Sequence, residues 1–223
     1  MAGLTQFSAV NLLPDVQVDQ TRWNRIPTEE VVAETAYAVG KRGIRVIRAK
    51  DRQEALDTLS RLIPRGADVM NGSSTTLIEI GYEALLKSEK TGWTDLHDKI
   101  TAENDERMRA LLRRKSVTAD YFISGANAIS QTGEIVACDM SGSRVGAWPF
   151  AAGHLILVCG INKIVPTLED ALRRVWEYAY PLEDARARKA YGIPSQIGKC
   201  VILAHEKIAG RVTLILISES LGY

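Results

Sequence analysis

The sequence predicts an α/β fold with a mixed, largely parallel sheet flanked by helices. Strand-like and helix-like apolar segments alternate along the chain, and residues 44–70 contain strand, helix and strand at the spacing of a βαβ unit. Such a unit requires parallel strands joined by a right-handed crossover. Short polar links later in the chain, such as Gln131-Thr132-Gly133, indicate antiparallel pairs as well. We therefore expect both kinds of pairing.

The elements follow from their caps and their periodicity. Thr28 can cap a first helix whose opening turn carries Glu29 and Glu30, which suit the positive end of the helix dipole. Asp51 and Thr167 can cap later helices in the same way. The expected helices cover 28–43, 51–63, 74–88, 101–115 and a long segment from 168 that Pro181 breaks or kinks. The expected strands cover 44–47, 67–70, 121–124, 135–138, 155–158, 200–203 and 212–217.

The composition is typical of one soluble globular domain. Of the 223 residues, 46% are hydrophobic and 25% are charged, with 28 Lys and Arg against 27 Asp and Glu. This charge balance argues against a nucleic-acid partner held by phosphate attraction. Residues 1–20 lack a secretory signal, and no apolar run approaches the roughly 20 residues of a membrane helix. We expect a cytoplasmic protein that binds no membrane, with an extension over residues 1–27 and one domain over 28–223.

The cysteine pattern predicts neither a disulfide framework nor a metal site. Cys138, Cys159 and Cys200 are odd in number, far apart and without Cys-x-x-Cys spacing. The histidines share no metal-ligand spacing either. We therefore expect reduced, buried cysteines, no metal and no evident cofactor.

The first polar segment that could carry chemistry is Met70–Thr76. It leaves a predicted strand and enters a predicted helix, where free N–H groups favour an anion. Hydroxyl groups come from Ser73, Ser74, Thr75 and Thr76, and Gly72 permits close backbone approach. The alternative is that Ser73 or Ser74 only caps the helix.

Three further polar segments follow predicted strands. In the second, Asn127 offers donors and an acceptor, Thr132 begins a turn, and Glu134 is either a base or nucleophile or a solvent-facing residue of that turn. In the third, Arg144 lies between two glycines and suits a carboxylate or phosphate, or it pairs with a surface acid. In the fourth, a buried strand ends at Asn162 and Lys163, where Lys163 either neutralises an anion or is exposed to solvent.

In this order, the segments resemble the lactate-utilisation domain family, often abbreviated LUD, from about Val31 to Tyr223. The resemblance rests on GSSTTLIEIG at 72–81, GANAISQTG at 125–133, GSRV at 142–145, GINKIV at 160–165 and LISESLGY at 216–223. It implies the fold of the sugar-phosphate isomerase and coenzyme A transferase superfamily. It also implies that any iron–sulfur centre needed for oxidation of lactate to pyruvate belongs to partner subunits, because this chain lacks the cysteine clusters of some larger relatives.

The resemblance also implies which residues form the site. Its pocket motifs fall on Ser73, Ser74, Thr75, Glu79, Asn127, Thr132, Arg144, Asn162 and Lys163. The leading hypothesis is a protein of lactate or small hydroxy-acid metabolism that binds a small anionic metabolite, with Glu79 or Glu134 as the acid–base residue. The alternatives are a stand-alone isomerase or coenzyme A transferase-like enzyme that uses a Glu, and a non-catalytic assembly subunit of an iron–sulfur oxidoreductase complex. Whether copies of the chain associate is left open.

Overall fold

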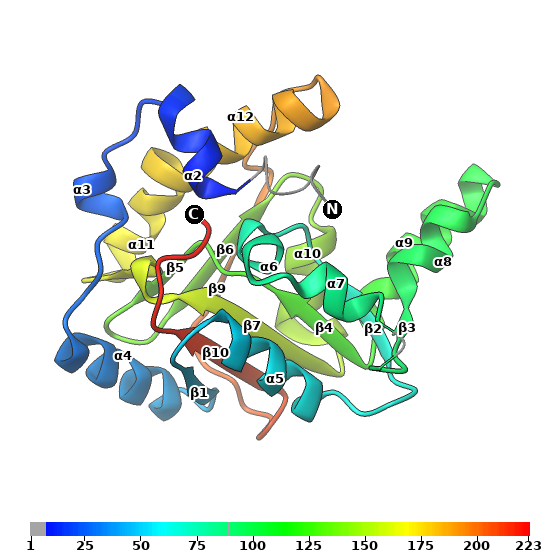
Figure 1. The fold of residues 1–223 in the computed structure, drawn as a ribbon, viewed down its shortest axis with the longest axis horizontal. Helices are drawn as coiled ribbons and strands as arrows, with labels where there is room; N and C mark the ends of the chain where they lie inside the picture. The colour runs from blue at the N-terminus through cyan, green and yellow to red at the C-terminus, as the bar shows by residue number, and fades with distance from the viewer. Residues whose placement is uncertain (1–7, 89) are drawn as a thin grey trace.

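A six-stranded parallel sheet forms the centre of the molecule (Figure 1). The computed structural model describes residues 8–88 and 90–223. The strand order is β1 (Arg45–Ala49), β10 (Val212–Ile217), β7 (His154–Gly160), β4 (Tyr121–Ser124), β2 (Asp68–Asn71) and β3 (Thr94–Asp95). All five pairings are parallel. The last strand in the chain lies between β1 and β7, and its run of buried Val, Thr, Leu and Ile is typical of a strand covered on both faces.

A second sheet of four strands stacks on the first. Its order is β8 (Ile164–Val165), β5 (Ala128–Ser130), β6 (Ile135–Asp139) and β9 (Lys199–Leu203). The β5–β6 and β6–β9 pairs are antiparallel, whereas β5 and β8 are parallel. The α/β prediction is therefore confirmed, but the antiparallel pairs lie in this separate sheet, because the chain leaves the parallel sheet after β4.

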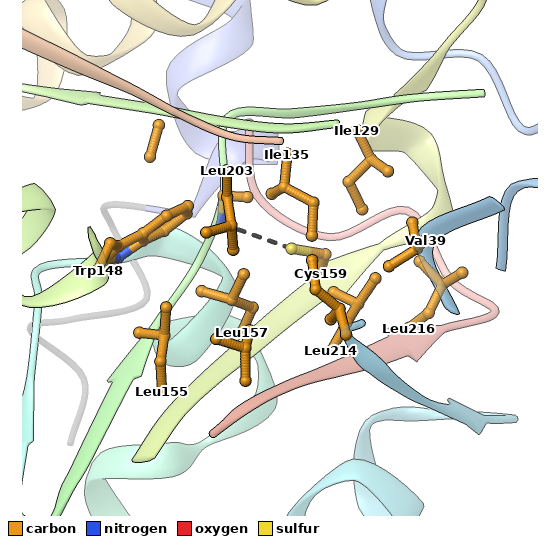
Figure 2. Close-up of a cluster of buried hydrophobic side chains, with 14 of the residues drawn as sticks. Val39, Ile129, Ile135, Trp148, Leu155, Leu157, Cys159, Leu203, Leu214 and Leu216 are labelled. Carbon is orange, nitrogen blue, oxygen red and sulfur yellow. Dashed lines mark hydrogen bonds between the residues drawn. The ribbon is translucent and has the colours of Figure 1, made fainter. Parts of the chain in front are cut away.

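Side chains that alternate along the strands build separate apolar cores. Leu155, Leu157 and Cys159 of β7 point toward the second sheet, where they meet Ile129 and Ile135 (Figure 2). The intervening residues of β7 point to the other face of the parallel sheet and pack beneath α5 (Arg52–Leu62), α6 (Thr75–Ile80) and α7 (Tyr82–Leu86). The outer face of the second sheet is covered by α11 (Leu168–Arg174), the π-helical turn η5 (Val175–Ala179) and α12 (Tyr180–Tyr191).

Two predicted helices are broken in the structure, whereas the helical segment from 168 continues through Pro181 to Tyr191. Gly81, with φ of 84°, separates α6 from α7 in the segment expected as one helix. The segment expected over 101–115 is divided into α8 (Leu96–Ala102) and α9 (Glu106–Lys115), because Asp105 caps the second helix through the N–H groups of Arg107 and Met108. Pro181 sits in the first turn of α12, where it is tolerated after the π-helical turn.

The remaining elements connect these layers and extend them. They are α2 (Ala9–Leu12), η1 (Leu13–Asp15), α3 (Gln20–Trp23), α4 (Glu29–Lys41), η2 (Ser116–Thr118), α10 (Ser143–Gly146), η3 (Ala147–Ala151) and η4 (Ile161–Lys163). Leu12 and Trp23 are buried against the second sheet and its helices, so the described part of the extension packs on the domain. Residues 1–7 lie outside the described residues. Within residues 8–88 and 90–223, no helix has both the length and the apolar character to cross a bilayer.

Candidate functional site

A cavity of about 490 Å³ opens at the carboxyl ends of three neighbouring strands of the parallel sheet. The ends of β2, β4 and β7 lead into residues 71–75, 125–127 and Lys163, which all line it. Residues 138–141, Ser143, Arg144, several residues of α12 and the segment 193–197 also line it. This is the edge at which ligands bind in open α/β sheets.

The cavity brings together seven residues that the sequence singled out as binding residues. They are Gly72, Ser73, Ser74, Thr75, Asn127, Arg144 and Lys163. They come from four separate segments of the chain, so the four polar segments each contribute to one space.

Three cationic side chains converge on three consecutive carbonyl groups beside this cavity. Arg144 Nη1 donates to the carbonyl oxygen of Gly125 at 2.9 Å, and Lys163 Nζ donates to that of Ala126 at 2.8 Å. Arg174 donates to the carbonyl oxygen of Asn127. The loop 125–127 is thereby held by one cation at each residue.

The remaining partners of these cations are also uncharged. Arg144 donates to the side-chain oxygen of Asn127 at 3.3 Å and to the carbonyl of Cys138, and Lys163 donates to the hydroxyl of Thr76 at 2.9 Å. Arg174 donates to the carbonyl of Trp23 at 2.9 Å. Among the ion pairs of the described residues, none involves Arg144, Lys163 or Arg174.

Burial without a carboxylate partner disfavours the charged forms of these groups. Burial lowers the pKa of Lys163 from 10.5 to about 8 and that of Arg174 to about 10, and it also lowers the pKa of Arg144. A charged group in a protein interior normally has an ionic partner. Two of these cations, Arg144 and Lys163, line the cavity, so its wall contains positive charges that have no carboxylate hydrogen-bond partner.

Asp139 positions Arg144 and does not pair with its guanidinium group. Its carboxylate accepts hydrogen bonds from the N–H groups of Gly142, Arg144 and Val145, the last two at 3.0 Å each. These contacts hold the first turn of α10. The Arg144 guanidinium is thus directed toward the loop 125–127 from a fixed backbone.

Two glycines allow the polar loops to approach one another. A Cβ atom on Gly72 would lie 2.5 Å from Cδ of Arg144, and one on Gly125 would lie 2.5 Å from Oγ of Ser74. Both distances are far shorter than van der Waals contact. Gly72 was predicted to permit a close approach, and the group that approaches it in the structure is the side chain of Arg144.

The serines of the first segment have different surroundings. Ser74 accepts a hydrogen bond from the N–H of Leu77 at 3.4 Å and so caps α6, a helix of only six residues. Ser74 therefore caps the helix, which is the second of the two roles expected for these serines. Ser73 is exposed and lines the cavity.

Glu79 and Asn162 lie outside the cavity lining and hold the 221–222 segment. Glu79 accepts hydrogen bonds from the N–H groups of Ala9 and Gly222, both at 2.7 Å. Asn162 accepts from the N–H of Leu221 at 3.0 Å and donates to Asn24 and to the carbonyl of Gly222. Their observed contacts join the two ends of the described chain to the domain.

Glu134 and Thr132 also lie away from the cavity, at the turn between β5 and β6. Glu134 is paired with Arg42 and accepts from the hydroxyls of Ser130 and Thr132. Burial raises its pKa, but these hydrogen bonds and Arg42 outweigh burial and hold it below the ordinary value. A general base at neutral pH needs the opposite shift. The geometry of the cavity thus gives no support to an acid–base role for Glu79 or Glu134.

The expectation of three reduced cysteines is wrong for two of them. Cys138 and Cys200 form a disulfide, because antiparallel pairing of β6 with β9 places these residues opposite each other. Cys159 is free and buried, as expected, and its sulfur accepts a hydrogen bond from the N–H of Ala126 (Figure 2). Among the described residues there is no group of three His, Cys, Asp or Glu side chains that would hold a metal ion.

Comparison with known proteins decides the family. The model of the LUD domain matches residues 32–217, most of the chain. The chain belongs to the LUD domain family. The resemblance seen in the sequence motifs is thereby confirmed.

One solved structure shows the LUD fold at low sequence similarity. It is a DUF162 family protein from Deinococcus radiodurans, with 12% identity and a TM-score of 0.50. The match covers 86% of this chain and 99% of the other. No curated protein matches the chain.

Sequence reasoning missed Arg174, a polar residue that helps to hold the site of this LUD domain. Arg174 lies on the stripe of α11 and η5 that also carries Ala171, Val175 and Tyr178, all of which are buried. A charged residue on an apolar stripe is a usable signal, since its side chain must find partners inside. Thr76 belongs to the first polar segment, but the sequence did not reveal its contact with Lys163, because that contact joins residues 87 positions apart.

Proposed function

We propose that this LUD domain binds a small anionic metabolite in the cavity at the carboxyl ends of β2, β4 and β7, as a protein of lactate or related hydroxy-acid metabolism. The observation that supports this most is the set of three cations, Arg144, Lys163 and Arg174, whose hydrogen-bond partners are all uncharged oxygens. An anion in the cavity stabilises these charges, because Coulomb attraction is strong where water is excluded.

The lining residues take different roles in this proposal. Arg144 and Lys163 supply positive charge, and Asn127 orients the ligand with its amide group. The exposed hydroxyl of Ser73 offers a further donor. Glu79 and Glu134 take no part, since their carboxylates are engaged elsewhere. For the same reason no observation favours a transferase that uses one of these residues as a nucleophile.

Oxidation of a 2-hydroxy acid to its 2-oxo acid releases two electrons and two protons. We assign the electron acceptor to a partner subunit, an iron–sulfur protein, and the binding of the acid to this chain. The protein itself acts in the cytoplasm in this proposal.

Calorimetric titration tests the binding. Lactate, pyruvate and ribose 5-phosphate are titrated into the parent protein and into Arg144→Met. We expect at least one of the three to bind the parent and to bind Arg144→Met about tenfold or more weakly, because a charged contact is lost.

The matched control is Lys207→Met, which removes an exposed positive charge outside the cavity. It is expected to bind like the parent, because exposed charges are screened by solvent. Thermal melting checks that all variants are folded. The proposal is contradicted if the parent binds none of the three ligands. It is also contradicted if folded Arg144→Met binds them as tightly as the parent does.

A further inference from the structure

The cavity is much larger than a three-carbon acid requires. Its volume is about 490 Å³, within the range of roughly 300–1,000 Å³ that accommodates drug-sized ligands. A lactate molecule near Arg144 and Lys163 leaves most of this space unfilled. A ligand that fills it must carry a further group beyond its acid group.

The lining of the cavity also presents large apolar side chains to solvent. Tyr191 at the end of α12 is 63% exposed, Ile193 is 53% exposed, and Met140 is 44% exposed. All three line the same cavity as Arg144 and Lys163. Exposed apolar side chains gathered in a concave site mark a surface that binds an apolar group.

The ring of Tyr191 is supported from one side. The guanidinium carbon of Arg186 lies over this ring, 5.3 Å from its centroid. Arg186 is 6% exposed and is fixed by two hydrogen bonds to Glu183, at 2.8 and 2.7 Å. Glu183 also accepts from the hydroxyl of Tyr223 at 2.7 Å. The Glu183 carboxylate is therefore neutralised within the wall, and it does not repel an anionic ligand.

We infer that the ligand of this cavity is an anion that carries an aromatic ring, with the acid group near Arg144 and Lys163 and the ring against Tyr191, Ile193 and Met140. This inference rests on the proposed function and adds the class of ligand. The same chemistry comes from two sources, an aromatic 2-hydroxy or 2-oxo acid and a nucleoside monophosphate. Aromatic contacts of this kind favour rings over aliphatic groups of the same size.

Two pairs of ligands test the inference by calorimetry. Lactate is compared with 3-phenyllactate, and ribose 5-phosphate is compared with adenosine monophosphate. In one pair we expect the member with the ring to bind about tenfold or more tightly than its partner. The pair that shows this gain identifies the source of the ring.

Tyr191→Ala is expected to remove most of that gain and to leave the affinity for the ligand without a ring unchanged. Tyr191→Phe is expected to retain the gain, because the ring supplies the contact. Tyr37→Ala is the control, since Tyr37 is also exposed, at 69%, but lies on α4 outside the cavity.

The outcomes separate this inference from the proposed function. If lactate or ribose 5-phosphate binds and neither ring-bearing ligand binds more tightly, the inference is overturned and the proposed function stands. If Tyr191→Ala weakens both members of a pair equally, the ring contact is also refuted. If none of these four ligands binds and pyruvate does not bind either, both proposals fail.

Discussion

Lys163 donates a hydrogen bond to the carbonyl oxygen of Ala126 at 2.8 Å, and its ammonium group has no carboxylate among its hydrogen-bond partners. The side chain is 2% exposed. Its burial lowers the pKa from 10.5 to about 8, so its charge changes close to physiological pH. The binding of an anion near Lys163 therefore depends on whether this amine is protonated.

The affinity for an anion is expected to fall as the pH rises through about 8. Lys163 is charged below its lowered pKa and neutral above it, and a bound anion favours the charged form. Binding near pH 8 is therefore expected to take up protons. Titration in buffers of different ionisation enthalpy, over a range of pH, measures both effects.

Lys163→Met is the control for this pH dependence. This variant is expected to bind the anion more weakly than the parent, and its affinity is expected not to change with pH between about 7 and 9.5. It is also expected to unfold at a higher temperature than the ligand-free parent at pH 7, because a buried charge without an ionic partner is removed. An unchanged pH profile in this variant would show that another group titrates.

In the ligand-free parent, stability has the opposite dependence on pH. The folded state holds Lys163 with a lower pKa than the unfolded state, so between pH of about 8 and 10.5 the unfolded chain binds more protons. The contribution of this group therefore stabilises folding increasingly as the pH rises through that window.

Gly72→Ala is expected to weaken anion binding by about tenfold or more. The new Cβ would lie 2.5 Å from Cδ of Arg144, which is anchored by its hydrogen bonds to Gly125, Asn127 and Cys138 and cannot move without losing some of them. Gly146→Ala is the matched control, because nothing lies within 4 Å of its Cβ position. Equal affinities of the two variants would show that the position of Arg144 does not matter.

Glu206→Ala is expected to lower the free energy of unfolding by roughly 3–5 kcal/mol. Glu206 and Arg211 are a buried pair, with side chains 7% and 5% exposed and a nitrogen–oxygen distance of 2.5 Å. Glu106→Ala removes an exposed pair with Arg109, at 3.9 Å, and is expected to cost no more than about 1 kcal/mol. Urea denaturation measures both values, and a similar loss in the two variants would contradict the difference.

The contribution of Glu206 is expected to depend on pH in the acid range. Burial raises its pKa, but the hydrogen bonds from Arg211 and from the N–H of Ile208 outweigh burial and lower it below 4.5. A carboxyl group with a lowered pKa stabilises the fold above its ordinary pKa, and this effect is lost as the pH falls through the lowered value.

Reduction of the Cys138–Cys200 disulfide is expected to lower stability by roughly 2–4 kcal/mol, because the bond joins residues 62 positions apart and restricts the unfolded chain. Thermal melting with and without reductant measures this difference. Cys200→Ser is expected to melt at the same temperature in both conditions. A thiol assay that finds three free cysteines in the denatured parent without reductant would contradict the disulfide.

Local patterns predicted the helices and strands because they depend on neighbouring residues. Asp51 and Thr167 cap α5 and α11 through the N–H groups of Glu54 and Asp170, as their positions before apolar stripes indicated. The strand, helix and strand expected over 44–70 are present as β1, α5 and β2, but β10, β7 and β4 lie between the two strands in the sheet. The segment expected as one helix over 74–88 is broken at Gly81, a residue whose freedom at positive φ the apolar pattern does not reveal.

The site was predictable only in part. The sequence alone indicated that Asn127 and Lys163 follow strand ends, and the parallel strands β4 and β7 bring their carboxyl ends to one edge. Arg144 instead follows β6 of the second sheet, so its place in the cavity depends on how the two sheets pack. It placed Glu79 and Glu134 among the candidate catalytic residues, but their partners Ala9, Gly222 and Arg42 lie 70 to 143 residues away along the chain. No local pattern encodes such contacts.

The family, the α/β class and the polar loops at the strand ends could thus be predicted from the amino-acid sequence, because motifs, periodicity, caps and turns involve residues close together in the chain. Three features could not: the antiparallel strands form their own sheet, Cys138 faces Cys200, and Arg144, Lys163 and Arg174 hold three successive carbonyl groups. These relationships depend on how distant segments pack, and packing is settled by the burial of the whole apolar surface at once.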